Sequence, residues 1–207
     1  MNYSAAISIL IIRFTISSMV GEKNVVLNII VNHKKVLIPN NYPYICLQLI
    51  WRSSMEIEAK LTSMGIKLPT TPDPIANYVT ATQVGDLIFL SGTTCYKDGA
   101  LLYKGRVGNE LTLDEGYQAA WQTMLNLLSV LKSKIGELDR VKQIVKINGY
   151  VNSTLEFDRQ PEVINGASDL LVQIFGEKGK HARTSIGTSI LPGQIPVEIE
   201  MIVQVQL

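Results

Sequence analysis

Hydrophobic and polar residues alternate most regularly near the C-terminus, between residues 181 and 205. Alternation at period two is typical of strands that bury one face. The apolar row of the last segment consists of Val197, Ile199, Met201, Val203 and Val205. A Pro192-Gly193 turn separates this segment from the residues that begin at His181, so the pattern predicts two strands paired as a closing hairpin.

Three further strands are predicted upstream. Residues 78–82 and 87–92 flank a turn and form a hairpin, whose second strand is apolar throughout and therefore central in its sheet. Residues 96–107 contain a Lys-Asp-Gly turn and are expected at the rim, and residues 141–151 form the next strand. The apolar face of that strand consists of Val145, Ile147 and Val151.

Two helices are predicted from apolar residues spaced three and four positions apart. The first begins at Thr112, which forms a capping box with Glu115, and ends at Gly136. Its apolar face consists of Tyr117, Ala120, Trp121, Met124, Leu128 and Leu131. The second begins at Pro161 and ends before Gly176. Its apolar face consists of Val163, Ile164, Ala167, Leu170, Leu171 and Ile174.

The resulting order, β-β-α-β-α-β-β, predicts an α+β fold in which two helices pack on one face of a β-sheet. The strand at residues 87–92 is apolar on both sides, so the opposite face of the sheet also needs a cover. A second subunit or the N-terminal segment would provide it, and we favour the subunit.

Residues 1–54 differ in character from residues 55–207. They are crowded with Ile and Asn, show no sustained helix or strand period, and carry five basic residues against one acidic residue. Their net charge of +4, within a total of +1, leaves −3 for the rest of the chain. We predict that residues 1–54 are an N-terminal extension outside a folded domain at residues 55–207, with Met55 as the natural start.

The segment from Ala5 to Val20 is apolar enough to suggest a signal peptide or a membrane anchor. Arg13 interrupts it, no basic segment precedes it and no small-residue cleavage pattern follows. We therefore expect no membrane association and a cytoplasmic location.

Composition limits the chemistry further. A net charge close to zero argues against a dedicated nucleic-acid binder, which normally carries a basic field. The two cysteines, Cys46 and Cys95, and the two histidines, His33 and His181, form no spaced cluster, so we expect no metal site. Cys95 is predicted to be a buried small side chain.

Charged and hydroxyl side chains gather in the two C-terminal strands. Arg183 begins the first of them, and Glu198 and Glu200 lie opposite the apolar row of the second. A guanidinium grips a carboxylate through two parallel hydrogen bonds, and a carboxylate can orient a water molecule and move protons. These residues therefore predict a polar cleft for a small anion and a water, with a solvent-facing cross-strand ion pair as the alternative.

Several motifs occur along the chain in a fixed order: PDPIANYVTA, GDLIFLSG, DRVKQIVKINGYVNS, HARTSIGTSILP and VEIE. Together they resemble the RidA/YjgF family, whose fold is called chorismate-mutase-like. GRVGNELTLDEGY and INGASDLL are most similar to the branch of that family described as endoribonuclease L-PSP-like. The resemblance covers residues 60–207 and leaves residues 1–54 out.

The resemblance implies a homotrimer with clefts between subunits. In the best-understood members it implies hydrolysis of reactive 2-enamino and 2-imino acids to 2-oxo acids and ammonia, without a cofactor. Matched motif by motif, Arg183 would bind the substrate carboxylate, Glu198 would lie near the attacking water and Tyr78 would complete the catalytic set. The further substrate-binding positions are matched by Ser91, Asn165 and Ser185, the last standing where the better-known deaminases often have cysteine.

Structural roles remain open for three of these residues. Tyr78 also suits an aromatic side chain at the edge of the core, and Ser91 suits a strand end where its hydroxyl bonds to backbone. Asn165 also suits a helix surface or a subunit contact.

Two other functions remain as alternatives to the deaminase. The family name suggests a ribonuclease, but the domain at residues 55–207 is net acidic and has His181 alone where phosphodiester cleavage favours a histidine pair. The third possibility is a non-catalytic trimer that binds small carboxylates in the same cleft.

Overall fold

The computed structural model describes residues 27–31, 34–38, 56–70 and 78–207, and of the first two ranges only the backbone. The chain divides into two compact units, Met1–Ser54 and Met55–Leu207. In the first unit, β1 (Leu27–Val31) and β2 (Lys34–Ile38) pair antiparallel. The sequence predicted no regular element there, yet both segments are rich in the apolar residues that favour strands.

The apolar segment at residues 5–20 lies outside the described residues. None of the helices in the described part of the chain combines the length and the apolar character that a membrane span requires.

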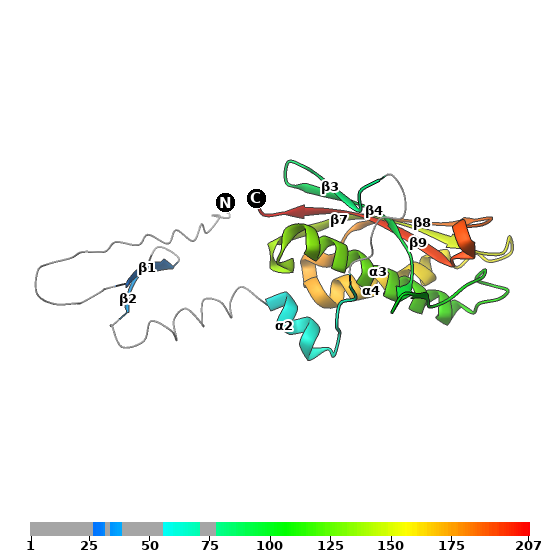
Figure 1. The fold of residues 1–207 in the computed structure, drawn as a ribbon, viewed down its shortest axis with the longest axis horizontal. Coiled ribbons are helices and arrows are strands. Elements are labelled where there is room, and N and C mark those ends of the chain that lie inside the picture. The colour runs from blue at the N-terminus through cyan, green and yellow to red at the C-terminus, as the bar shows by residue number, and fades with distance from the viewer. Residues whose placement is uncertain (1–26, 32–33, 39–55, 71–77) are drawn as a thin grey trace, which may run out of the picture. The chain divides into compact units, whose positions relative to one another are not determined.

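A five-stranded sheet organises the second unit. Its strands are β3 (Ala81–Val84), β4 (Leu87–Thr93), β7 (Val141–Asn152), β8 (Ala182–Thr188) and β9 (Val197–Val205). They follow the spatial order β3-β4-β9-β7-β8, in which β7 and β8 are parallel and the other pairs antiparallel (Figure 1). The predicted α+β class is confirmed, as is the hairpin of β3 and β4.

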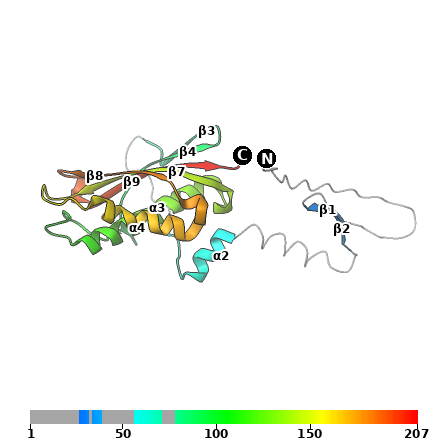
Figure 2. The same ribbon diagram turned by 180° about the vertical axis from the view of Figure 1, so that it is seen from behind.

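Two helices, α3 (Leu113–Ile135) and α4 (Gln160–Phe175), lie side by side on one face of this sheet (Figures 1 and 2). The Thr112 hydroxyl accepts the N–H of Glu115 and the Glu115 carboxylate accepts the N–H of Thr112, which confirms the predicted capping box. The helices approach closely at Gly166, where a Cβ atom would lie 2.1 Å from the backbone oxygen of Tyr117. Only glycine fits such a crossing.

The core lies between the helices and the sheet. All six predicted apolar residues of α4 are buried, and so is the whole alternating row of β9. The packing of these two rows against α3 accounts for the layer arrangement.

The predicted closing hairpin is wrong, because β7 lies between β8 and β9. The chain reaches β8 from β7 through α4, and a strand–helix–strand connection sets its strands parallel and adjacent. β9 then pairs with β4 on one side and β7 on the other, at the centre of the sheet. The alternation of hydrophobic and polar residues identifies which face of a strand is buried, but not which strand lies beside it in the sheet.

Val145 was predicted in the buried row of β7 and is instead 37% exposed. The register of β7 against β9 shifts between Ile144 and Lys146, so Val145 is the extra residue of a β-bulge. The buried row therefore continues from Ile144 to Ile147 and Val151.

The remaining elements are short. They are α2 (Glu56–Ser63), β5 (Tyr96–Lys97), β6 (Ala100–Leu101), η1 (Leu138–Arg140), η2 (Gly176–Gly179) and η3 (Pro192–Gln194). β5 and β6 form the predicted rim hairpin. The sequence analysis missed α2 because its two large apolar residues, Ile57 and Leu61, span a single helical turn, which is too short a period to identify a helix.

Candidate functional site

A hollow of about 270 Å³ lies where β4, β9 and the segment before β3 meet. It is lined by Tyr78, Thr80, Ser91, Gly92, Thr93, Thr94, Tyr96, Val130, Pro192, Ile195 and Glu198. Three residues that the sequence singled out, Tyr78, Ser91 and Glu198, thus share one hollow. They come from positions 13 to 120 residues apart in the chain, which only the strand order brings together.

Glu198 supplies the ionisable group of this hollow. Its side chain is partly buried, and neither carboxylate oxygen has a hydrogen-bond partner among the described residues. Burial raises the pKa of Glu198, and the neighbouring charge of Glu200 raises it further. Glu200 differs, because its carboxylate accepts a hydrogen bond from Asn148 at 2.6 Å. Glu198 is therefore the carboxylate that is free to hold a water or exchange a proton.

Gly92 makes room for this carboxylate. A Cβ atom at position 92 would lie 2.2 Å from Oε1 of Glu198. The absence of a side chain thus sets the place of the carboxylate against the backbone of β4.

Ser91 and Tyr78 have different surroundings. The Ser91 hydroxyl donates to the backbone oxygen of Val79 at 2.8 Å, which is the backbone-bonded role left open for it. Tyr78 is 47% exposed, and its hydroxyl has no partner among the residues described. Tyr78 therefore covers little core and faces the solvent side of the hollow.

Arg183 lies elsewhere, on the edge strand β8. Its Nη1 atom donates to Oδ1 of Asn165 at 2.8 Å and to Oγ of Ser168 at 3.0 Å, both on α4. These two bonds use both hydrogens of Nη1. Within the described part of the chain, Nε and Nη2 have no partner, so the edge of the guanidinium that binds a carboxylate in a bidentate manner is free.

One chain does not bring Arg183 and Glu198 together. Arg183 is in register with Ile147, whose side chain is buried beneath the helices, and its contacts with α4 lie on that same side of the sheet. Glu198 is in register with Tyr150 and belongs to the opposite side. No ion pair of Arg183 occurs among the described residues, so the cross-strand alternative is wrong for this side chain.

Residues around Arg183 extend this second cluster. Ser185 lies two positions along β8, on the same side of the strand, and its Oγ atom is buried without a partner in the described part of the chain. His181 contacts Ser168 through Nε2 at 3.1 Å. The sequence reading missed Ser168, although it lies three positions after Asn165 and so one helical turn further along the same face.

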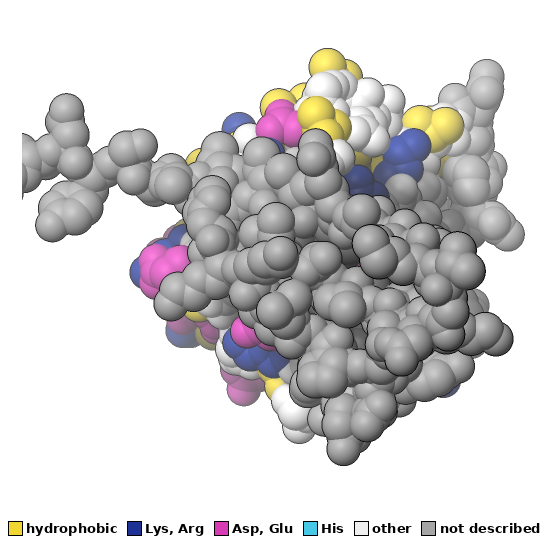
Figure 3. Space-filling model, turned by 90° about the vertical axis from the view of Figure 1, so that its left-hand side faces the viewer, with side chains coloured by type: hydrophobic (Ala, Val, Ile, Leu, Met, Phe, Trp, Pro, Cys, Tyr) yellow, Lys and Arg dark blue, Asp and Glu magenta, His cyan; other side chains and the backbone are white. Residues whose placement is uncertain are grey.

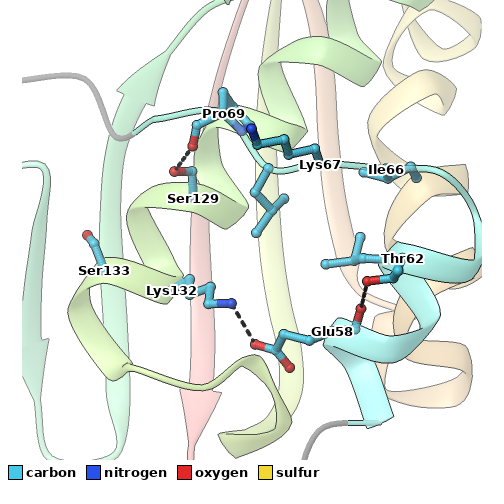
Figure 4. Close-up of a pocket in the computed structure, with 10 residues that line it drawn as sticks. Glu58, Thr62, Ile66, Lys67, Pro69, Ser129, Lys132 and Ser133 are labelled. Carbon is cyan, nitrogen blue, oxygen red and sulfur yellow. Dashed lines mark hydrogen bonds and ion pairs between the residues drawn. The ribbon is translucent and has the colours of Figure 1, made fainter.

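A further hollow of about 550 Å³ lies between α2 and α3 (Figure 4). Glu58 of α2 forms an ion pair of 3.3 Å with Lys132 of α3 at its base. The Glu58 carboxylate also accepts the N–H of Leu138, and Asp139 accepts the N–H groups of Glu56 and Ile57, so α2 and η1 cap each other. These contacts attach α2 to the domain.

The remaining candidates from the sequence are quickly placed. Cys95 is fully buried, as predicted, and burial raises the pKa of its thiol. No cluster of three or more His, Cys, Asp or Glu side chains suited to a metal ion occurs in the ranges that the structure describes. Where described side chains are visible in Figure 3, acidic and basic groups are interspersed.

The five-stranded sheet thus carries, on one side, an arginine whose Nε–Nη2 edge has no partner among the described residues and, on the other side, a partly buried carboxylate. The family model described as "YjgF/chorismate_mutase-like, putative endoribonuclease" matches residues 58–201. The chain belongs to this family.

Two curated relatives and one solved structure illustrate the kinship. Protein TCP17 of Trypanosoma cruzi is 39% identical over 153 residues, which is 73% of this chain and 96% of the relative. The 2-iminobutanoate/2-iminopropanoate deaminase of Dermatophagoides farinae is 26% identical over 68% of this chain and 95% of its own. The protein Atu1372 of Agrobacterium tumefaciens, of unknown function, has 35% identity and a TM-score of 0.71, covering 77% of this chain and 99% of its own.

Proposed function

We propose that this protein hydrolyses reactive 2-enamino and 2-imino acids to 2-oxo acids and ammonia. Arg183 binds the substrate carboxylate and Glu198 orients the attacking water. The observation that carries the proposal is the guanidinium of Arg183, which is anchored through Nη1 and has no partner at Nε and Nη2 among the residues that the structure describes. The name of the Dermatophagoides farinae relative supports the same chemistry.

The reaction follows from these two groups. Bidentate binding of the carboxylate fixes the adjacent imine carbon, and water adds to that carbon while its proton passes by way of a carboxylate to nitrogen. The resulting carbinolamine expels ammonia and leaves the 2-oxo acid. An enamine enters the same route after protonation at its terminal carbon. A raised pKa makes the Glu198 carboxylate a stronger base, which suits it to accept a proton and return it.

The separation of Arg183 from Glu198 favours a site between chains. The two groups lie on opposite sides of one sheet, so a single copy presents the arginine without the carboxylate on one side and the carboxylate without the arginine on the other. A neighbouring copy would supply the missing half, and a homotrimer closes three such sites by symmetry. Under this arrangement Tyr78, Ser91 and Glu198 of one copy face Arg183 of the next.

A ribonuclease function has less support. His181 lies next to the proposed site, but both of its ring nitrogens are engaged, one by Gly179 and one by Ser168. Burial lowers its pKa, which disfavours the protonated form that an acid catalyst needs. No second histidine accompanies it in the described residues.

A coupled assay tests the proposal. The full-length chain is added to an enzyme that generates 2-aminoacrylate, and 2-oxo acid release is followed. We expect faster release with the wild type and a loss of about a hundredfold in Arg183→Ala, because the substrate is no longer oriented. Lys146→Ala, on the neighbouring strand, is the matched control for removal of a cation. Carboxylate binding without any gain in hydrolysis would instead indicate a non-catalytic binding protein.

A further inference from the structure

The donor and the acceptor in each hydrogen bond of His181 can be assigned from the chemistry of the atoms that it contacts. Nδ1 lies 2.6 Å from the backbone oxygen of Gly179, which can only accept, so Nδ1 carries a hydrogen. Burial and the nearby charge of Arg183 both favour the neutral ring. In a neutral ring with its hydrogen on Nδ1, Nε2 is an acceptor.

Ser168 must then donate its hydroxyl hydrogen to Nε2 of His181, across 3.1 Å. With that hydrogen committed, the Ser168 oxygen offers lone pairs to Nη1 of Arg183 at 3.0 Å. Asn165 accepts the other hydrogen of Nη1. The chain of bonds therefore runs from Arg183 through Ser168 to His181 and ends on backbone.

We propose that His181, acting through Ser168, is a positioning residue for Arg183. It fixes the plane of the guanidinium so that the Nε–Nη2 edge points outward to a carboxylate. The effect of this positioning on catalysis rests on the proposed function. The hydrogen bonds among His181, Ser168 and Arg183 do not depend on that function. His181 touches no substrate in this role.

Loss of the acceptor at Nε2 would disturb the arrangement. In a protonated ring both nitrogens donate, so the Ser168 oxygen would receive hydrogens from His181 and Arg183 together and its own hydrogen would lose its acceptor. Carboxylate binding should therefore weaken as His181 is protonated. The other charged groups on the surrounding elements are Lys142 and Lys146 on β7, Glu162 and Asp169 on α4, and Glu177 and Lys178 on η2, followed by Lys180, which pairs with Glu177.

The substitutions are chosen to separate the acceptor from its titration. His181→Gln keeps an acceptor near the position of Nε2 but cannot be protonated, and His181→Leu removes the acceptor. Ser168→Ala breaks the connection itself. Gln173→Ala, at an exposed position of α4, is the control for changes in that helix.

Binding of pyruvate to the full-length protein is measured by calorimetry between pH 5 and 8. We expect about tenfold weaker binding in Ser168→Ala and His181→Leu at pH 7.5, and near wild-type binding in His181→Gln and Gln173→Ala. Toward pH 5 the wild type should weaken relative to His181→Gln, and this comparison cancels the titration of Glu198. Equal affinity in all five proteins across this range would overturn the inference.

A second readout does not involve binding or activity. ¹⁵N spectra of histidine-labelled protein, assigned with His181→Gln, should give a neutral ring with its hydrogen on Nδ1, and Ser168→Ala should shift the Nε2 signal. A hydrogen on Nε2 would overturn the inference. If the wild type hydrolyses imines but Ser168→Ala binds pyruvate as the wild type does, the positioning role alone is rejected. If Ser168→Ala binds pyruvate more weakly but the wild type does not hydrolyse imines, the proposed reaction alone is rejected.

Discussion

At the level of single residues, the position of the Glu198 carboxylate depends on a glycine, Gly92. Gly92 leaves the space that Oε1 occupies, and a Cβ atom there would overlap it at 2.2 Å. The carboxylate is the flexible end of its side chain, so it would move rather than unfold the strand.

Gly92→Ala is therefore expected to lower deaminase activity about tenfold or more while changing the unfolding free energy little. The coupled assay and urea denaturation measure the two effects. Thr82→Ala, on the exposed side of β3, is the control. Full activity in Gly92→Ala would show that the carboxylate position is unimportant for turnover.

Glu200 contributes to the same hollow through its charge. Removal of that charge in Glu200→Gln should lower the pKa of Glu198, because one of the two causes of its raised value disappears. If turnover needs ionised Glu198, the acidic limb of the pH–activity profile should move to lower pH in this variant. An unmoved limb would assign it to another group.

At the level of elements, α2 is attached by two carboxyl groups that face each other. Burial is the largest cause that raises the pKa of Asp139 to about 6, and its hydrogen bond with Glu58 acts in the same direction. A shared proton also supplies a partner for Oε2 of Glu58, which is otherwise buried without one in the described part of the chain. We infer that Asp139 donates this proton to Glu58 in slightly acidic solution.

The sign of the effect on stability follows. A carboxyl group whose pKa is higher in the folded chain than the usual 3.8 stabilises the fold below that usual value, and the stabilisation is lost as pH rises through about 6. Asp139→Asn retains the hydrogen bonds without titrating. Relative to the wild type, its free energy of unfolding should therefore rise by about 1 kcal/mol between pH 5 and pH 8, after allowance for solvent screening. Urea denaturation at both pH values measures this difference, with the exposed Glu137→Gln as control. A stability difference between Asp139→Asn and the wild type that is the same at pH 5 and pH 8 would contradict the shared proton.

The elements themselves were largely predictable from sequence. The capping box at Thr112 and the apolar rows of α4 and β9 carry strong periodic signals, and burial confirms them. The order of the strands was not predictable in the same way. β8 pairs with β7 because α4 connects them, and the alternation of hydrophobic and polar residues does not indicate which strand lies beside β8. The bulge at Val145 was not predictable either, because one extra residue only changes which later residues of the strand face the core.

At the level of the whole molecule, the sequence singled out Arg183, Asn165, Ser91, Tyr78 and Glu198 and predicted Arg183 and Glu198 in one polar cleft. One chain collects them into two clusters on opposite sides of a sheet. The proposed joining of the clusters requires a second copy, and a sequence contains no direct record of that contact. Ser168 was missed for a related reason, since a lone serine on a helix carries no signal until its neighbours are known.

Complementation tests whether the clusters join between chains. Arg183→Ala and Glu198→Gln are each expected to be inactive, and we expect co-expression in equal amounts to restore about a quarter of wild-type activity. A site regains both groups only when each neighbour carries the right variant, which random assembly into closed rings gives in about one case of four. The measured mass should be that of a trimer. Zero recovery in mixed trimers would place both groups of each site in a single chain.

The tight crossing of the two long helices at Gly166 has an evolutionary consequence. Asn165 precedes this glycine and Ser168 follows two positions later, so the residues that hold the guanidinium sit where α4 rests on the backbone of α3. A side chain at position 166 would lift the helix and carry both anchors away from Arg183. Natural selection on the placement of Arg183 would thus also act on position 166, where helix spacing alone excludes every residue except glycine.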